Sequence, residues 1–316
     1  MAARSDSSLA ALLLSQRLVD TPVAPLKSAE YWALLDSLGD PAALLGLDTA
    51  GIAGTTGVDP ALADRLARLL DAATSFAIHL DQAEQSGLRV IASVDESYPR
   101  VLIERLGRSA PPLLYAVGDP ALLTGELLGI VGSRNVTDAV AGVARAAAAG
   151  AVDAGLGVAS GAAKGVDRSA MSTALEAGGT VVGVLADSLA RMTRDVEVRR
   201  AVADGRLCLC TPYKPTAGFS VANAMGRNKL IYALSRATLV VAADAEQGGT
   251  WAGAAEALRR STAPVIVWTG AGAGTGNALL VGRGATGLDD LAGLFPLPDP
   301  EMWISRRRSS QLALEV

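Results

Sequence analysis

The chain of 316 residues is poor in aromatic side chains, which make up 4% of it, and it holds one histidine and two cysteines. A single histidine, His79, gives little support to a serine triad, and we expect it on a helix face. Cys208 and Cys210 fall short of the four ligands of a structural zinc site, and two neighbours on one strand have poor disulfide geometry. We therefore predict buried thiols, no metal and a reducing cytoplasm.

Long apolar runs and nucleotide-binding fingerprints are also missing. The apolar run at 9–14 is closed by Arg17, well short of the roughly 18 residues of a membrane span. It lacks the basic leader and cleavage site of a signal peptide. The sequence has no P-loop, and the Gly-Leu-Gly at 155–157 precedes its strand, so the dinucleotide fingerprint fails as well. We expect a cytoplasmic protein with no membrane contact and no cofactor.

Half of the residues are hydrophobic, which is enough to bury at least one large core. From Leu127 onward, apolar strands alternate regularly with helical stretches, a pattern typical of a parallel sheet with helices on both faces. The predicted strands are 127–132, 156–160, 180–186, 207–210, 237–243 and 264–268, and the predicted helices are 138–154, 165–177, 195–203, 219–235 and 248–260. The fold class is α/β, an extended Rossmann-like parallel sheet preceded by a small helical N-terminal domain.

Three regions follow from this pattern. Residues 1–87 form a helical N-terminal (SAM-like) region that begins with a loose polar leader over residues 1–8 and either binds DNA or a partner protein or packs as an appendage. Its helical segments are 9–18, 31–38, 41–47 and 60–83, with a turn at 51–57. Residues 88–290 form the extended Rossmann domain. Residues 291–316 are a tail with a short helix and no winged helix, in which Arg306, Arg307 and Arg308 are solvated.

Small residues and cations follow the first two strands of the predicted sheet. They are Gly132, Ser133 and Arg134 after the first strand, and Ser160, Gly161 and Lys164 after the second. The carboxyl ends of parallel strands share one rim, where small residues let a ligand approach the backbone. Amide hydrogens at helix starts favour anions, and Arg134 and Lys164 add positive charge. The sequence therefore predicts phosphate binding at this rim.

The net charge of −4 means that any nucleic-acid site must be a local patch. Such a patch lies between Asp204 and Asp244, a stretch with no acidic residue and five cations. They are Arg206, Lys214, Arg227, Lys229 and Arg236. Arg227 and Lys229 are two apart and cannot share a helix face, so one can reach a ligand while the other serves structure. Tyr213 and Phe219 lie nearby, and each either stacks on a base or packs in the core or a loop.

Two further glycine turns follow later strands. Gly248, Gly249 and Thr250 open a helix, and their amides can hold an anion. The loop with glycines at 270, 272, 274 and 276 either touches ligand or is a flexible turn. Asp167 has no carboxylate partner that would mark acid and base work, and we interpret it as a helix N-terminal charge or an orienter of Arg134 or Lys164.

These residues carry a family likeness. The motifs are Val-Gly-Ser-Arg (131–134), Ser-Gly-Ala-Ala-Lys-Gly-Val-Asp (160–167), Ala-Leu-Glu-Ala-Gly-Gly-Thr (174–180), Gly-Arg-Asn-Lys-Leu-Ile-Tyr-Ala-Leu-Ser (226–235), Gln-Gly-Gly-Thr (247–250) and Gly-Asn-Ala-Leu-Leu (276–280). In order and spacing they resemble the DNA-processing protein A (DprA/Smf) family over roughly residues 88–286. The family's histidine after the aspartate is replaced by the Arg-Ser-Ala-Met at 168–171, and residues 187–215 diverge.

The resemblance implies a non-catalytic protein that binds single-stranded DNA, forms a homodimer and helps to load a RecA-type recombinase in recombination or natural transformation. Carried over to this sequence, the DNA-contacting residues are Gly132, Ser133, Arg134, Ser160, Gly161, Lys164, Arg227 and Asn228, to which we add Lys229, Gly248, Gly249 and Thr250. Two alternatives stay open. One is a nucleotide-binding enzyme similar to the lysine-decarboxylase-like phosphoribohydrolases, whose motif places a glutamate three residues after the threonine, where Gly253 stands here. The other is a sensor of a small nucleotide.

Overall fold

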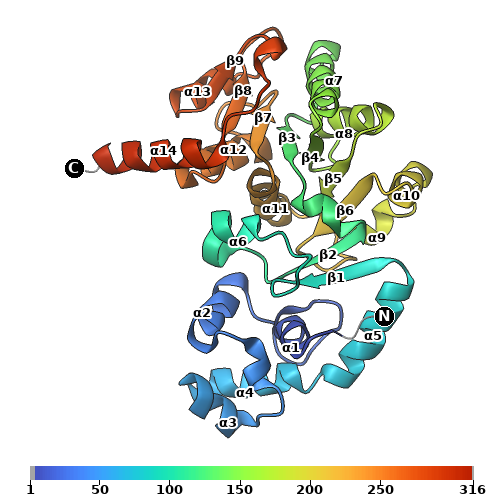
Figure 1. Ribbon diagram of the computed structural model, residues 1–316, viewed down its shortest axis with the longest axis vertical. Coiled ribbons are helices and arrows are strands. Elements are labelled where there is room, and N and C mark those ends of the chain that lie inside the picture. Colours follow the sequence, from blue (N-terminus) through green and yellow to red (C-terminus); the bar gives the residue numbers. More distant parts are fainter. Residues whose placement is uncertain (1–3, 315–316) are drawn as a thin grey trace. The chain divides into compact units, whose positions relative to one another are not determined.

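The computed structural model describes residues 4–314 (Figure 1). The first three residues of the predicted polar leader, the last two of the predicted tail and the side chain of Arg308 lie outside the described part. The chain forms two compact units, one running up to Val117 and including Pro212–Pro215, the other comprising the rest. The predicted domain boundary between residues 87 and 88 stays a prediction.

The first unit is mainly helical. Its elements are α1 (Asp6–Ser15), α2 (Ser28–Leu38), η1 (Pro41–Leu44), α3 (Thr49–Thr56), α4 (Pro60–Leu70), α5 (Ala73–Gln85), β1 (Leu88–Ala92), α6 (Val101–Leu106), η2 (Gly107–Ser109) and β2 (Leu113–Gly118). From Leu9 to Leu14, helix α1 is apolar on all sides, and a helix of that kind is buried. Its residues Ala10, Ala11 and Leu12 are 0% exposed. Figure 1 shows α1 nearly end-on among the other blue helices.

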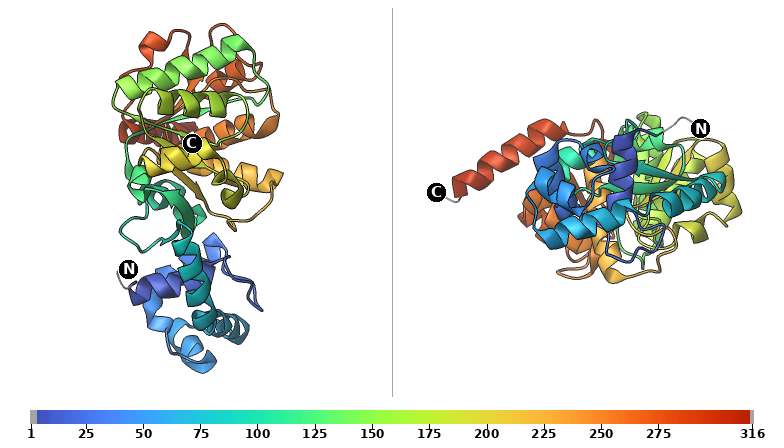
Figure 2. Two further views of the ribbon diagram at one scale, coloured as in Figure 1. Left: turned by 90° about the vertical axis from the view of Figure 1, so that its right-hand side faces the viewer. Right: turned by 90° about the horizontal axis from the view of Figure 1, so that it is seen from below.

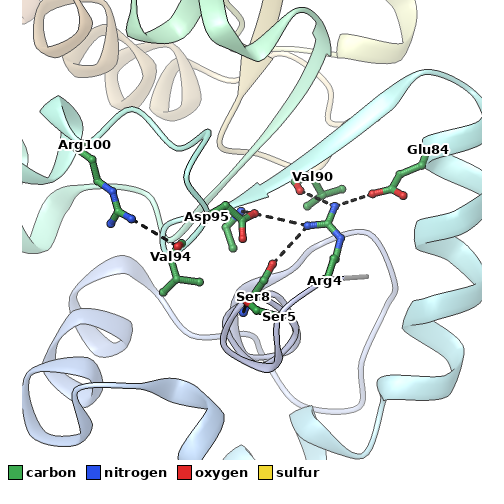
Figure 3. Close-up of polar contacts among 9 residues, drawn as sticks. Arg4, Ser5, Ser8, Glu84, Val90, Val94, Asp95 and Arg100 are labelled. Carbon is green, nitrogen blue, oxygen red and sulfur yellow. Dashed lines mark hydrogen bonds and ion pairs between the residues drawn. The ribbon is translucent and has the colours of Figure 1, made fainter. Parts of the chain in front are cut away.

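Arg4 joins the start of the chain to this unit. Its Nη2 donates to Oε1 of Glu84 at 2.6 Å and to the carbonyl oxygen of Val90 at 2.9 Å. Its Nη1 lies 3.5 Å from Oδ2 of Asp95 (Figure 3). Because α1 begins at Asp6, the prediction of a loose leader is wrong for residues 4–8.

Two local predictions in this unit are corrected. The segment predicted as a turn at 51–57 is largely helical, because the side chain of Asp48 accepts a hydrogen bond from the Gly51 amide and caps α3, which ends at Gly57 in a left-handed conformation. The helix predicted over 60–83 is two helices, since α4 ends at Leu70 and α5 begins at Ala73.

The second unit contains a parallel sheet in the order β6-β5-β4-β3-β7-β8-β9. Its strands are β3 (Leu127–Val131), β4 (Gly157–Ser160), β5 (Val181–Val184), β6 (Leu207–Thr211), β7 (Ala237–Val240), β8 (Val265–Trp268) and β9 (Thr286–Leu288). Leu128 pairs with Val158 of β4 on one side and with Ala237 of β7 on the other, both in parallel register. The predicted Rossmann-like parallel sheet is confirmed.

Helices cover both faces of this sheet. The helical elements of this unit are η3 (Pro120–Thr124), α7 (Asp138–Asp153), α8 (Val166–Glu176), α9 (Leu189–Met192), α10 (Val196–Ala203), α11 (Val221–Leu234), α12 (Gly248–Arg260), α13 (Asn277–Gly282), η4 (Leu291–Gly293) and α14 (Pro300–Leu314). Figure 2 shows α7 and α8 side by side, and in Figure 1 the strands separate them from α12 and α13. Right-handed crossovers give this arrangement, since the chain steps from β3 toward β6 and then returns to β7.

The strand order reverses at β3, which lies between β4 and β7. In open parallel sheets, ligands bind in the crevice beyond the carboxyl ends of the strands at such a switch point. The turns after β3 and β7 are therefore the places where a ligand site is expected.

The rare residue types are placed as predicted. Cys208 and Cys210 are free and buried on β6. Burial raises the pKa of Cys210 to about 12, so its thiol stays protonated. His79 is exposed on α5, and its Nδ1 lies 2.8 Å from the carbonyl oxygen of Ser75 one turn earlier.

Candidate functional site

A pocket of about 650 Å³ lies in the second unit at the carboxyl ends of β3 and β7. Residues 131–135 line one part of it, and α11 with the residue Phe219 before it lines another. Residues 242–244 and 246–252, after β7 and in the start of α12, line the third part. Its size and its position at the switch point suit a small ligand or one unit of a polymer.

The turn after β3 presents an uncompensated cation. Arg134 is exposed, and its guanidinium lies over the ring of Phe219, 5.0 Å from the centroid. No Asp or Glu in the described part of the chain forms an ion pair with Arg134. Its charge is therefore available to an anionic ligand.

Hydrogen bonds tie the turns of the pocket together. Oγ1 of Thr250 donates to the carbonyl oxygen of Gly132 at 3.0 Å, and Nδ2 of Asn228 donates to the carbonyl oxygen of Gly249 at 2.9 Å. A Cβ on Gly132 would overlap the side chain of Val166, so only glycine allows this turn to lie against α8. The start of α12, the turn after β3 and the middle of α11 are thus held in one arrangement.

The floor of the pocket contains a buried charge pair. Arg227 and Asp167 are each 5% exposed. Burial raises the pKa of Asp167, against the opposing effects of the Arg227 charge and of backbone hydrogen bonds from Ala163, Gly161 and Gly132. Arg227 fits here because Gly161 has no Cβ, which would overlap the guanidinium.

This pair revises the interpretation of Arg227 and decides between two alternatives for Asp167. The sequence-based interpretation placed Arg227 on the DNA-contacting rim and made Asp167 either a helix N-terminal charge or an orienter of Arg134 or Lys164. In the structure, Arg227 lies beneath the rim. Asp167 lies in the first turn of α8, as the first alternative predicted, and it interacts with Arg227 and accepts hydrogen bonds from the turns after β3 and β4. Because the Asp167 carboxylate offsets the charge of Arg227, Arg227 contributes little net attraction to a phosphate.

The predicted site residues divide into those that line the pocket and those that do not. Gly132, Ser133, Arg134, Arg227, Asn228, Gly248, Gly249 and Thr250 line the pocket. Ser160 is fully buried, and its Oγ donates to the carbonyl oxygen of Ile130 at 2.6 Å, which joins β4 to β3. Lys164 is exposed and Lys229 is half-buried, and neither lines the pocket. Tyr213 belongs to the first unit.

Several lining residues were missed at the sequence level. Val221 and Met225 are 68% and 47% exposed, and with the 52% exposed Phe219 they form an apolar group at the pocket. Val221 and Met225 are four residues apart on one face of α11, a spacing that could have indicated them. Asp244 and Glu246 also line the pocket, and no local signal marked them.

The next glutamate along α12 does not take the place of the one missing from the alternative enzyme motif. Glu256, on the helix that opens with Gly248, pairs with Arg260 at 3.0 Å and is not a lining residue. Among the residues that the structure describes, no three His, Cys, Asp or Glu side chains gather where they could hold a metal ion. The described helices include none with the length and apolar character needed to cross a membrane.

Comparisons with known proteins support the predicted relationship. The family of DNA recombination-mediator protein A matches residues 89–294. Protein Smf of Synechocystis sp. is 32% identical over 179 residues, a match that covers 54% of this chain and 43% of that protein. The chain therefore spans less than half of that relative's length.

Two solved structures share the fold. DNA processing protein A (DprA) of Streptococcus pneumoniae superposes with a TM-score of 0.66 at 23% identity, covering 92% of this chain and 96% of that one. DNA processing protein A of Helicobacter pylori, solved for its single-stranded DNA binding mode, gives a TM-score of 0.53 at 21% identity, covering 71% and 96%. Because the family matches most of the chain with its motifs in order, this protein belongs to the DNA recombination-mediator protein A (DprA/Smf) family.

Proposed function

We propose that this protein binds single-stranded DNA in the pocket between β3 and β7 and acts as a recombination mediator. Its family is that of a recombination mediator, and the Helicobacter pylori relative binds single-stranded DNA. The role is one of binding and positioning DNA, without catalysis.

The observation that carries the proposal is the position of the Arg134 guanidinium over the ring of Phe219. An unpaired guanidinium lies over an exposed aromatic ring at the edge of the pocket. Single-stranded nucleic acid offers phosphates for the first and flat bases for the second, and proteins that bind it combine cationic grooves with stacking rings. The exposed side chains of Val221 and Met225 extend the apolar surface on which a base can rest.

The start of α12 adds a second contact for phosphate. Gly248 and Gly249 are exposed, and α12 begins at Gly248 and runs to Arg260. The first amides of a helix have no partner within the helix and point toward an anion, and the helix dipole adds to the attraction. Glycines at these positions let the DNA backbone approach closely.

The test is a titration of the protein with labelled oligo-dT at two salt concentrations. We expect Arg134→Ala to weaken binding at low salt and to reduce the salt dependence by about one phosphate contact, a change in log–log slope of roughly 0.7. Lys164→Ala should also weaken binding, although less, because Lys164 lies outside the pocket. Arg145→Ala is the matched control, since Arg145 is exposed on α7 and does not line the pocket.

Equal affinities for the Arg134→Ala and Arg145→Ala variants would refute the assignment of the pocket to DNA. Hydrolysis of nucleoside monophosphates is assayed in parallel. Base release that is lost with the pocket variants would favour the phosphoribohydrolase-like alternative, and tight mononucleotide binding without oligonucleotide preference would favour the nucleotide sensor.

We further propose that the protein acts in the cytoplasm as a homodimer that loads a RecA-type recombinase in recombination or natural transformation. The expected result is faster filament assembly by the recombinase on DNA coated with a single-strand-binding protein, and loss of that effect in Arg134→Ala. Sedimentation analysis tests the dimer. A monomer that still accelerates filament assembly would separate the two parts of this proposal.

A further inference from the structure

We propose that Asp244 reads the exocyclic amino group of a base held in the pocket, so that the site favours amino-bearing bases such as cytosine over uracil or thymine. The inference rests on the proposed function and deepens it, because it gives a base preference to a site whose phosphate contacts are indifferent to sequence.

The lining of the pocket includes groups of both charge signs. Arg134 and the start of α12 favour anions, whereas two acidic residues, Asp244 and Glu246, line the same pocket. Glu246 pairs with Arg283 at 3.5 Å. Asp244 is exposed, and none of the ion pairs or side-chain hydrogen bonds among the described residues involves its carboxylate.

The backbone on both sides of Asp244 is fixed by residues that follow β8. The amide of Ala243 donates to Oδ1 of Asn277 at 2.8 Å, and the amide of Ala245 donates to Oγ1 of Thr275 at 3.1 Å. The Gly276 amide donates to the carbonyl oxygen of Ala243 at 2.8 Å. Asp244 therefore stands at a held position and not on a free loop, as a residue that selects between ligands requires.

Asn277 shows how this support is built. It is 1% exposed, and its Nδ2 donates to the carbonyl oxygens of Val241 and Trp268 at 2.9 and 2.7 Å. The loop with glycines at 270, 272, 274 and 276 does not line the pocket. It lies instead against the end of β7, since a Cβ on Gly274 would overlap the backbone of Ala243.

An unpaired carboxylate in a site for phosphates needs a different partner. Like charges repel, so Asp244 disfavours a phosphate beside it and favours a hydrogen-bond donor. Within a DNA strand the sugars carry no free hydroxyl, and the donors are those of the bases. A carboxylate accepts well from the amino group of cytosine. Uracil presents a carbonyl oxygen at that position, and its one ring donor lies between two carbonyl groups.

Three homopolymers of equal length separate the possible donors. Oligo-dC and oligo-dU share a deoxyribose backbone and differ in the amino group, while oligo-dU and oligo-rU differ in the 2′-hydroxyl. We expect wild-type protein to bind oligo-dC at least about fivefold more tightly than oligo-dU, the lower end of what one base-reading side chain provides. In Asp244→Asn the ratio should fall to near one, because the amide can both donate and accept.

Glu246→Gln is the matched control, since it removes one negative charge from the same segment. It should change the affinity for all three homopolymers in parallel and leave their ratios unaltered. A parallel gain for all three in Asp244→Asn would show simple charge repulsion and overturn the inference. A preference for oligo-rU over oligo-dU that Asp244→Asn abolishes would assign the carboxylate to a sugar hydroxyl, and this also overturns it.

The same titrations distinguish the inference from the function on which it rests. If wild-type protein binds oligo-dC and oligo-dU equally and Arg134→Ala weakens both, the DNA site stands and the role of Asp244 falls. If wild-type protein binds none of the homopolymers, both proposals fail.

Discussion

Gly161→Ala tests the arrangement of the pocket floor most directly. A Cβ added to Gly161 would overlap Nη1 and Cζ of Arg227, and even Nη2 would lie 2.5 Å from it. To regain an ordinary contact of about 3.5 Å, Nη1, the nearest of these atoms, must retreat by roughly 2 Å. It has little room, because Arg227 is 5% exposed. We expect the free energy of unfolding to fall by about 1–3 kcal/mol, the usual cost of overpacking a core.

The assay is urea denaturation of the variant, with hydrogen exchange of peptides from β4 and α11 to localise the loss to the second unit. The clash depends on the Arg227 side chain, so Gly161→Ala should cost less than about 0.5 kcal/mol in an Arg227→Ala background, by the logic of a double-mutant cycle. Gly142→Ala is the control, because a Cβ there meets only Nη2 of Arg145 at 3.9 Å. As a helix-interior glycine it should stabilise by about 0.5–1 kcal/mol. An equal cost of Gly161→Ala in both backgrounds would refute the described contact.

Three further predictions concern the pH dependence and the packing of each unit. Burial raises the folded-state pKa of Asp167 above 3.8, so its contribution to stability is full below that pH and is lost as pH rises through the folded pKa. Asp167→Asn should remove this part of the pH profile, and unchanged profiles from urea melts at several pH values would contradict it. Asn277→Ala should lower the unfolding free energy by about 2–4 kcal/mol, because buried backbone groups such as the Ala243 amide lose their partner; a loss below about 1 kcal/mol would show that water replaces it. Arg4→Ala, which removes partly buried ion pairs, should destabilise the first unit by about 1–2 kcal/mol in thermal melts. Arg108→Ala should lower the stability by less than about 0.5 kcal/mol, because the side chain of Arg108 is 66% exposed.

Strands β3 to β8 of the parallel sheet were predictable because they are wholly buried. Runs such as the one in β3, in which each residue is buried, carry a continuous apolar signal in the sequence. Strand β9 was missed for the opposite reason, since Thr286 and Gly287 are exposed and the strand is only three residues long. Helix α3 was missed because Gly51 and Gly54 look like turn residues, while the cap from Asp48 outweighs them.

The pocket-lining residues that could be identified from the sequence are those that lie together in one turn. Gly132, Ser133 and Arg134, and likewise the segment from Gly248 to Thr250, line the pocket as the glycine and cation pattern indicated. What the sequence could not reveal were pairings across long separations. The burial of Arg227 depends on space left by a glycine after β4, and the partner that fixes Ala243 comes from the segment after β8.

The hydrogen bonds from Thr250 to Gly132 and from Asn228 to Gly249 have a consequence for how the site can change. Each hydrogen bond joins two different segments of the pocket. A single turn transferred from a relative would therefore lack the partner of its hydrogen bond. Alterations to ligand choice are easiest in side chains that project from this frame, and replacement of its segments is feasible only as a set. The hydrogen bonds of the frame join protein groups to one another, so little ordering cost is expected on association.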